Sequence, residues 1–123
     1  MMLTTAEDWR SVLKCEFESD DGSFLSLLTE QHRWDKEAFR ELVEAMRVCC
    51  VECSEDDHLE RWMAHGFFYV PAFIRAWTMQ DGFAKPDERY WNRAIELLDV
   101  LSHWFFWGEP PTENGSVDVL MLE

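Results

Sequence analysis

Residues 54–82, SEDDHLERWMAHGFFYVPAFIRAWTMQDG, decide the fold that this sequence predicts. Their apolar side chains recur at steps of three or four, which places them on one face of an α-helix. This stripe comprises Leu59, Trp62, Met63, Phe67, Val70, Phe73, Ile74 and Trp77. The remaining faces are also apolar and include Phe68, Tyr69, Ala72 and Ala76. We therefore predict a central helix over about residues 55–80, covered by neighbours on more than one side.

Local signals mark the ends and the middle of this predicted helix. Ser54 begins a weak capping box and predicts the start, while Gly82 can adopt a left-handed conformation and predicts the end. Pro71 removes a backbone donor and clashes with the carbonyl group four residues earlier, which predicts a kink or a break near Tyr69. One kinked helix is the preferred interpretation, and two short helices that meet at Pro71 are the alternative. Gly66 is expected to let a neighbour approach closely.

Four further helices are predicted from capping residues and apolar spacing. The first covers about residues 5–15, and a short second helix, for which a strand is the alternative, starts at residue 23. The third opens with Asp35 as its N-cap, where Trp34 can pack on Phe39 as a hydrophobic staple. The last runs from Pro86, in its first turn, to about residue 107 and stops at Gly108.

The segments outside these helices are acidic or rich in turn residues. Residues 16–22, EFESDDG, carry four carboxylates and predict an exposed acidic loop. Residues 109–123 form a tail in which turn residues precede an apolar run, compatible with a short strand or an extended arm. The 123 residues thus predict a single all-α domain, a compact bundle of about five helices.

Composition and charge limit the environment and the partners of this chain. Hydrophobic residues make up 47% of it, which predicts a folded protein. We find neither an apolar run of membrane-spanning length nor a signal-peptide pattern, and adjacent cysteines favour reduced thiols, so a cytoplasmic location is expected. The net charge of −14 repels nucleic acid and anionic membranes and favours a basic partner. The same charge can also serve only solubility.

One cysteine cluster has the residue types of a metal site. Cys49, Cys50 and Cys53 precede His58 and His65 in the chain. Zinc sites usually draw on two ligand pairs, whereas here the second pair is missing and the three cysteines continue an apolar helix face. Packing is therefore the preferred interpretation, with metal binding or redox chemistry as minor alternatives.

No catalytic constellation stands out in this sequence. It contains no glycine-rich phosphate loop, no nucleophile elbow and no His-Glu-x-x-His helix, and its adjacent carboxylates at helix starts diverge. Arg61 and His65 resemble the Arg-and-His motif of helical HEPN ribonucleases, but their gap is shorter and begins with Trp62. We therefore expect a non-enzymatic protein without cofactor.

Large aromatic residues end the last predicted helix. Residues 104–107, WFFW, place rings on all sides of one helical turn, so some rings must face away from the core. Phe106 and Trp107 are the candidates for exposed anchors, which either the tail or a partner covers.

Small size, strong acidity and the lack of a catalytic set resemble bacterial immunity proteins, which bind and neutralise a cognate secreted toxin. The resemblance implies an inhibitor that covers the active or substrate-binding cleft of a basic toxin domain. The candidate partner-binding residues are Glu16, Glu18, Asp20, Asp21, Glu52, Glu55, Asp56, Asp57, Glu60, Phe106 and Trp107.

Two other classes of binding protein are kept as alternatives. A nucleic-acid mimic of the anti-restriction or anti-CRISPR type would bind a nuclease with strong salt dependence. A helical adaptor or secretion chaperone would use the exposed aromatic residues, and its binding would survive high salt. The sequence leaves open whether the chain is a monomer or a homodimer.

Overall fold

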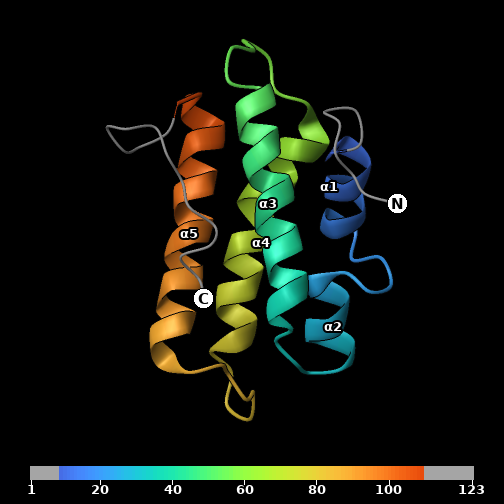
Figure 1. Ribbon diagram of the computed structural model, residues 1–123, viewed down its shortest axis with the longest axis vertical. Coiled ribbons are helices and arrows are strands. Elements are labelled where there is room, and N and C mark those ends of the chain that lie inside the picture. Colours follow the sequence, from blue (N-terminus) through green and yellow to red (C-terminus); the bar gives the residue numbers. More distant parts are fainter. Residues whose placement is uncertain (1–8, 110–123) are drawn as a thin grey trace.

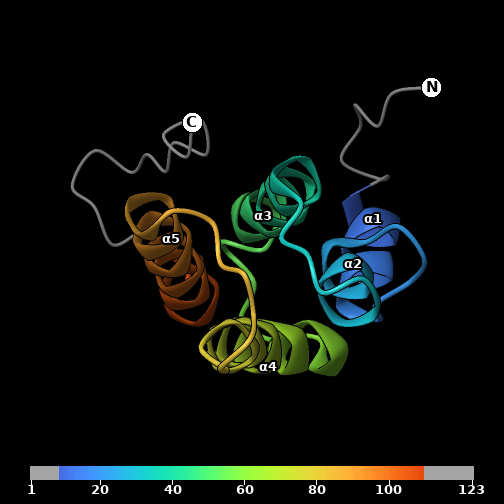
Figure 2. The same cartoon turned by 90° about the horizontal axis from the view of Figure 1, so that it is seen from below.

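The computed structural model describes residues 9–109, and every regular element in that range is an α-helix. The helices are α1 (Trp9–Phe17), α2 (Phe24–Glu30), α3 (Lys36–Glu52), α4 (Arg61–Thr78) and α5 (Glu88–Trp107). They form a compact bundle in which α1 and α2 share one corner and α3, α5 and α4 occupy the others (Figures 1 and 2). The all-α prediction is confirmed. None of the helices described is long and apolar enough to cross a membrane.

The position of α4 differs from the prediction. It packs against α5 and α1, whereas α3 packs against α1, α2 and α5. Phe68 and Tyr69 on the outer side of α4 are 74% and 47% exposed. The predicted cover of the faces that hold these two side chains is therefore wrong, because α4 occupies a corner of the bundle and turns one apolar stripe inward. The residues of that stripe that are buried are Met63, Phe67, Val70 and Ile74.

The predicted start of α4 is also wrong. Cys53 is the C-cap of α3, and Glu60 is the N-cap of α4, with no side-chain capping bond. Residues 54–60 are therefore a connection, since the chain must turn back between α3 and α4 (Figure 1). At its other end α4 stops at Thr78, and Gly82 adopts its left-handed conformation, φ +91°, in the following loop rather than at the helix terminus.

Helix α4 continues through Pro71, so one helix rather than two is correct. A proline at this position cannot donate to the carbonyl group of Phe67, four residues earlier. The hydroxyl group of Ser102 in α5 donates to that carbonyl oxygen instead, at 3.0 Å. This contact supplies the acceptor with a donor and ties α5 to α4. A kink near Tyr69 stays a prediction.

The predicted punctuation of α3 is confirmed. The Asp35 side chain accepts a hydrogen bond from the backbone N–H of Ala38 at 2.9 Å. The rings of Trp34 and Phe39 pack with their centroids 4.9 Å apart, which is the predicted staple. The indole N–H of Trp34 also donates to the hydroxyl oxygen of Tyr90 in α5, at 3.1 Å. The start of α3 is therefore joined to the start of α5.

The ends of α2 and α5 agree with the capping signals with one correction. Ser23 caps α2 by accepting from the N–H of Ser26, so the helix rather than the strand is correct. Asp87 is the N-cap of α5, and its carboxylate accepts from the first N–H groups of the helix, so Pro86 lies before the helix and not in its first turn. Gly108 ends α5 at φ +87°, as predicted.

The core draws side chains from all five helices. Its largest fully buried members include Leu13, Phe24, Leu28, Phe39, Leu42, Met46, Met63, Phe67, Ile74, Leu98 and Leu101. Helix α1 extends to Phe17, so the predicted acidic loop begins two residues later than expected. The predicted helix start at residues 5–8 and the tail beyond Glu109 lie outside the described residues.

Candidate partner-binding surfaces

The first acidic segment follows α1, and it loses one predicted member. Glu18, Asp20 and Asp21 are exposed, but Glu16 is only 6% exposed. Glu16 lies three residues after Leu13 and so continues the buried stripe of α1. It is therefore corrected from a partner-binding residue to a core residue.

The buried carboxyl group of Glu16 has one hydrogen-bond donor. The backbone N–H of Phe24 donates to it at 3.3 Å. Burial raises the pKa of Glu16 from its ordinary value of 4.5 to about 7, the Phe24 N–H opposes that rise, and the nearby carboxylate of Glu41 adds to it. The protonation state of Glu16 therefore affects the stability of the fold and not the binding surface.

The second acidic segment connects α3 to α4. Its carboxylates are all exposed and belong to Glu52, Glu55, Asp56, Asp57 and Glu60. Arg61 is the only lysine or arginine in residues 52–61. This connection is therefore a strongly negative surface segment.

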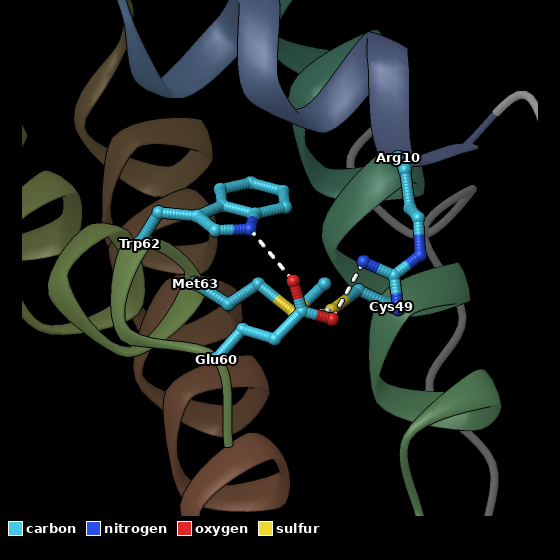
Figure 3. A network of polar contacts seen from close by, with 5 residues as sticks. All are labelled: Arg10, Cys49, Glu60, Trp62 and Met63. Atoms are coloured by element: carbon cyan, nitrogen blue, oxygen red, sulfur yellow. Dashed lines mark hydrogen bonds and ion pairs between the residues drawn. The ribbon is translucent and has the colours of Figure 1, made fainter.

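Glu60 fastens this connection to α1. Its carboxylate forms a 2.6 Å ion pair with Arg10 and accepts a 3.0 Å hydrogen bond from the indole N–H of Trp62. Figure 3 shows the Glu60 carboxylate between these two side chains. The hydrogen bond from Arg10 and, to a smaller extent, that from Trp62 lower the pKa of Glu60 below its ordinary value. We call Arg10, Glu60 and Trp62 the Glu60 clip.

The structure does not merge the two acidic segments. The Glu60 clip places the last residue of the second segment beside the start of α1, whereas Glu18, Asp20 and Asp21 follow the end of α1. A helix of nine residues is about 13 Å long. One contact surface therefore does not contain both segments without covering the whole of α1.

Two of the four rings at the end of α5 face away from the core. Phe106 and Trp107 are 45% and 71% exposed, whereas Trp104 and Phe105 are buried. The exposed rings line a groove of about 330 Å³ between α4 and α5, and Phe68 lines it from the α4 side. Sequence reasoning missed Phe68 as a surface residue, although its position outside the apolar stripe of α4 was a usable signal.

Gly108 joins the aromatic and acidic features. A β-carbon on Gly108 would lie 3.4 Å from the carbonyl oxygen of Ser54, so the end of α5 adjoins the start of the second acidic segment. Both lie at the same end of the bundle, at the top of Figure 1. We call this surface the acidic–aromatic end. It consists of Glu52, Glu55, Asp56, Asp57, Phe106 and Trp107.

The cysteine cluster is part of the core. Cys49, Cys50 and Cys53 are buried, and the Cys50 thiol donates to the carbonyl oxygen of Leu101 at 3.4 Å. Burial raises the pKa of the Cys49 and Cys50 thiols, which keeps them protonated. The packing interpretation is confirmed. Within residues 9–109 no group of three or more His, Cys, Asp or Glu side chains is arranged to hold a metal ion.

His65 also has a structural partner. It is exposed, and its ring stacks on that of Tyr69 with the centroids 5.5 Å apart. Tyr69 stacks in turn on Phe73, and Phe73 on Trp77, one helical turn at a time. His65, the histidine of the ribonuclease-like Arg61 and His65 pair, is therefore the first ring in a row of stacked aromatic side chains along α4.

The acidic–aromatic end and the groove between α4 and α5 are thus the two surface features from which a function can be inferred. No protein-family model, curated protein or solved structure matches this chain.

Proposed function

We propose that this protein is a non-enzymatic inhibitor that binds a basic protein partner through its acidic–aromatic end. The observation that carries the proposal is the close approach of Gly108 to the Ser54 carbonyl group, because it brings the end of α5, which holds the exposed rings, next to the segment that holds the exposed carboxylates. Rings supply apolar area that loses water on binding, and carboxylates steer an oppositely charged partner and select against others. The two together are the usual make-up of a tight and specific binding surface.

Two further observations support a role in rapid and specific association. The net charge of −14 attracts a basic partner over long range and speeds its encounter. The Glu60 clip fastens the acidic connection at its α4 end, so less order has to be gained on binding. In this proposal Glu18, Asp20 and Asp21 contribute to the long-range attraction rather than to the contact.

The partner class that fits this surface is a toxin domain with basic residues in its cleft, as in bacterial immunity systems. Enzymes that act on anionic substrates hold them with lysine and arginine side chains. Carboxylates of the acidic–aromatic end would pair with those side chains while Phe106 and Trp107 fill the mouth of the cleft. Inhibition then follows from occupation of the substrate's place, in the cytoplasm of the cell that makes both proteins.

Capture from the native host tests this proposal. The intact chain is immobilised, exposed to host protein with the product of the adjacent reading frame co-expressed, and washed at about 0.05 M and then about 1 M salt. We expect to capture one basic protein, in an amount equimolar to the immobilised chain. This protein should be inactive while it is bound. If no basic protein is captured, the inhibitor proposal is wrong.

The same experiment separates the two alternatives. A captured nuclease that DNA displaces in competition would indicate a nucleic-acid mimic. A partner that stays bound in high salt and ignores the Asp56→Lys/Asp57→Lys variant, but is lost from Phe106→Ala/Trp107→Ala, would indicate an adaptor or secretion chaperone.

A further inference from the structure

The groove between α4 and α5 carries a more specific inference about the partner. We infer that it docks an amphipathic helix of the partner, two turns of which lie in the groove, with the basic end of that helix at the acidic–aromatic end. The inference rests on the proposed function for the charge of the partner. It adds the secondary structure, the apolar spacing and the direction of the segment that binds.

The walls of the groove are exposed aromatic rings. Phe68 rises from α4 and is 74% exposed, and Trp107 rises from α5 and is 71% exposed. Smaller side chains, those of Pro71, Ala72 and Ser102, also line it. Large rings beside small residues leave a recess that apolar side chains can enter, which is the usual form of a helix-binding groove.

Apart from His103, whose ring stacks on that of Trp107, the polar side chains in the groove already have partners. The Ser102 hydroxyl group donates to the Phe67 carbonyl oxygen, and Arg75 and Asp99 form a 2.7 Å ion pair. The Arg75–Asp99 pair has no net charge, on a molecule whose net charge is −14. An apolar face therefore suits the groove better than a row of basic side chains does.

The length of the groove matches two turns of helix. Its lining runs from Phe67 to Arg75 along α4 and from Asp99 to Trp107 along α5. At about 1.5 Å per residue these stretches are about 10–12 Å long. A bound helix spans about the same length between anchors at positions i, i+4 and i+7.

The charge around the groove sets the direction of the bound helix. The Trp107 end continues into the second acidic segment through the contact of Gly108 with Ser54. The opposite end holds the Arg75–Asp99 ion pair, in which the charge of Arg75 balances that of Asp99. Basic residues of the partner helix therefore belong at the Trp107 end.

A synthetic peptide tests the inference without the native partner. The probe is a fluorescent peptide of about 14 residues, with leucines at i, i+4 and i+7 and lysines at one end, titrated with the intact chain in fluorescence anisotropy. We expect saturable binding, weakened about tenfold by Phe68→Ala and by Trp107→Ala. Met79→Ala is the matched control, because Met79 is 63% exposed but does not line the groove, and it should leave the affinity unchanged.

Two altered peptides separate shape from charge. A peptide of the same composition with its leucines scrambled around the helix should not bind, and one with glutamates in place of lysines should bind about tenfold more weakly. Equal binding of the scrambled peptide, no saturable binding, or no effect of Phe68→Ala and Trp107→Ala would overturn the inference. Circular dichroism melting of each variant confirms that it is folded.

Two other occupants would also overturn it, and each has its own signature. A dimer in sedimentation that Trp107→Ala converts to monomer would assign the groove to a second copy of the chain. Faster amide exchange over residues 117–122 in the intact Trp107→Ala variant would assign it to the chain's own tail. The peptide assay needs no native partner. Failure of the helix-docking inference can therefore be distinguished from failure of the proposed function, which the capture experiment tests.

Discussion

The hydroxyl group of Ser102 donates a 3.0 Å hydrogen bond to the carbonyl oxygen of Phe67, on the neighbouring helix. Phe67 precedes Pro71 by four residues, so its carbonyl group lacks the N–H donor that an α-helix normally provides. A side chain of α5 thus compensates for a proline inside α4. This contact gives a donor to the acceptor that Pro71 leaves without one, and it ties α5 to α4 beside the groove.

The Ser102→Ala variant should destabilise the fold by about 1–2 kcal/mol, since it leaves the Phe67 carbonyl group without this donor. In a Pro71→Ala background the backbone N–H of residue 71 can donate instead, so the same change should cost about 1 kcal/mol less. Urea unfolding of the four proteins of this cycle measures the coupling. Ser11→Ala, an exposed serine in α1, controls for loss of a hydroxyl group. Equal costs in both backgrounds would show that Ser102 does not serve the acceptor freed by Pro71.

Gly66 is predicted to tolerate no side chain. A β-carbon at this position would overlap the ring of Phe17, which packs edge-on against Phe67 at 5.6 Å and Trp62 at 6.3 Å. Gly66→Ala should therefore destabilise the protein by about 1–3 kcal/mol, even though alanine favours helix. Thermal unfolding measures the cost, and Phe17→Leu in the same chain should recover part of it. A more stable Gly66→Ala variant would contradict the close approach of Phe17.

The buried carboxyl group of Glu16 predicts a pH dependence of stability. The unfolded chain ionises Glu16 near 4.5, whereas burial raises the pKa in the folded protein to about 7. Between these values the folded state binds more protons, so this group makes stability fall as pH rises through the window, by about 3 kcal/mol in total. Glu16→Gln should remove that fall and stabilise the protein at about pH 8.

Urea unfolding at about pH 5 and about pH 8 measures this contribution as the difference between the native chain and Glu16→Gln. Glu18→Gln is the matched control, because Glu18 is exposed two residues away. A gap between the native chain and Glu16→Gln that does not widen with pH would contradict the burial of an ionisable group at this position.

The Glu60 clip should order the acidic connection more than it stabilises the fold. Arg10 and Glu60 are about half exposed, at 49% and 46%, so Arg10→Gln should change the free energy of unfolding by less than about 1 kcal/mol. Amide exchange over residues 54–60 should nevertheless become several-fold faster. Arg75→Gln breaks an ion pair of similar exposure and should leave this exchange unchanged. Unaltered exchange in Arg10→Gln would show that the clip does not hold the connection.

Much of the fold was predictable because its signals are local. Asp35 with Trp34, Ser23 and Gly108 each set a helix end through contacts within a few residues, and those ends were predicted correctly. The start of α4 was not, because the capping pattern at Ser54 competes with the need to turn the chain after α3. Only the packing of α3 against its neighbours shows that the chain turns after α3 instead of starting a new helix at Ser54.

The candidate site was less predictable, because exposure depends on tertiary contacts. Glu16 looked like a loop carboxylate, but α1 runs on to Phe17 and turns Glu16 inward. Phe68 looked covered, but α4 lies at a corner of the bundle. The close approach of Gly108 to Ser54 joins residues far apart in the sequence, and nothing in a local pattern indicates it.

The central claim is that the acidic–aromatic end, not acidity in general, binds the partner. Two charge reversals that change the net charge equally, Asp56→Lys/Asp57→Lys and Asp20→Lys/Asp21→Lys, test it most directly when their affinities for the captured partner are measured at physiological salt. We predict that reversal at residues 56 and 57 weakens binding at least about 100-fold, whereas reversal at residues 20 and 21 weakens it less than about tenfold. Equal losses, or a larger loss at residues 20 and 21, would contradict the claim.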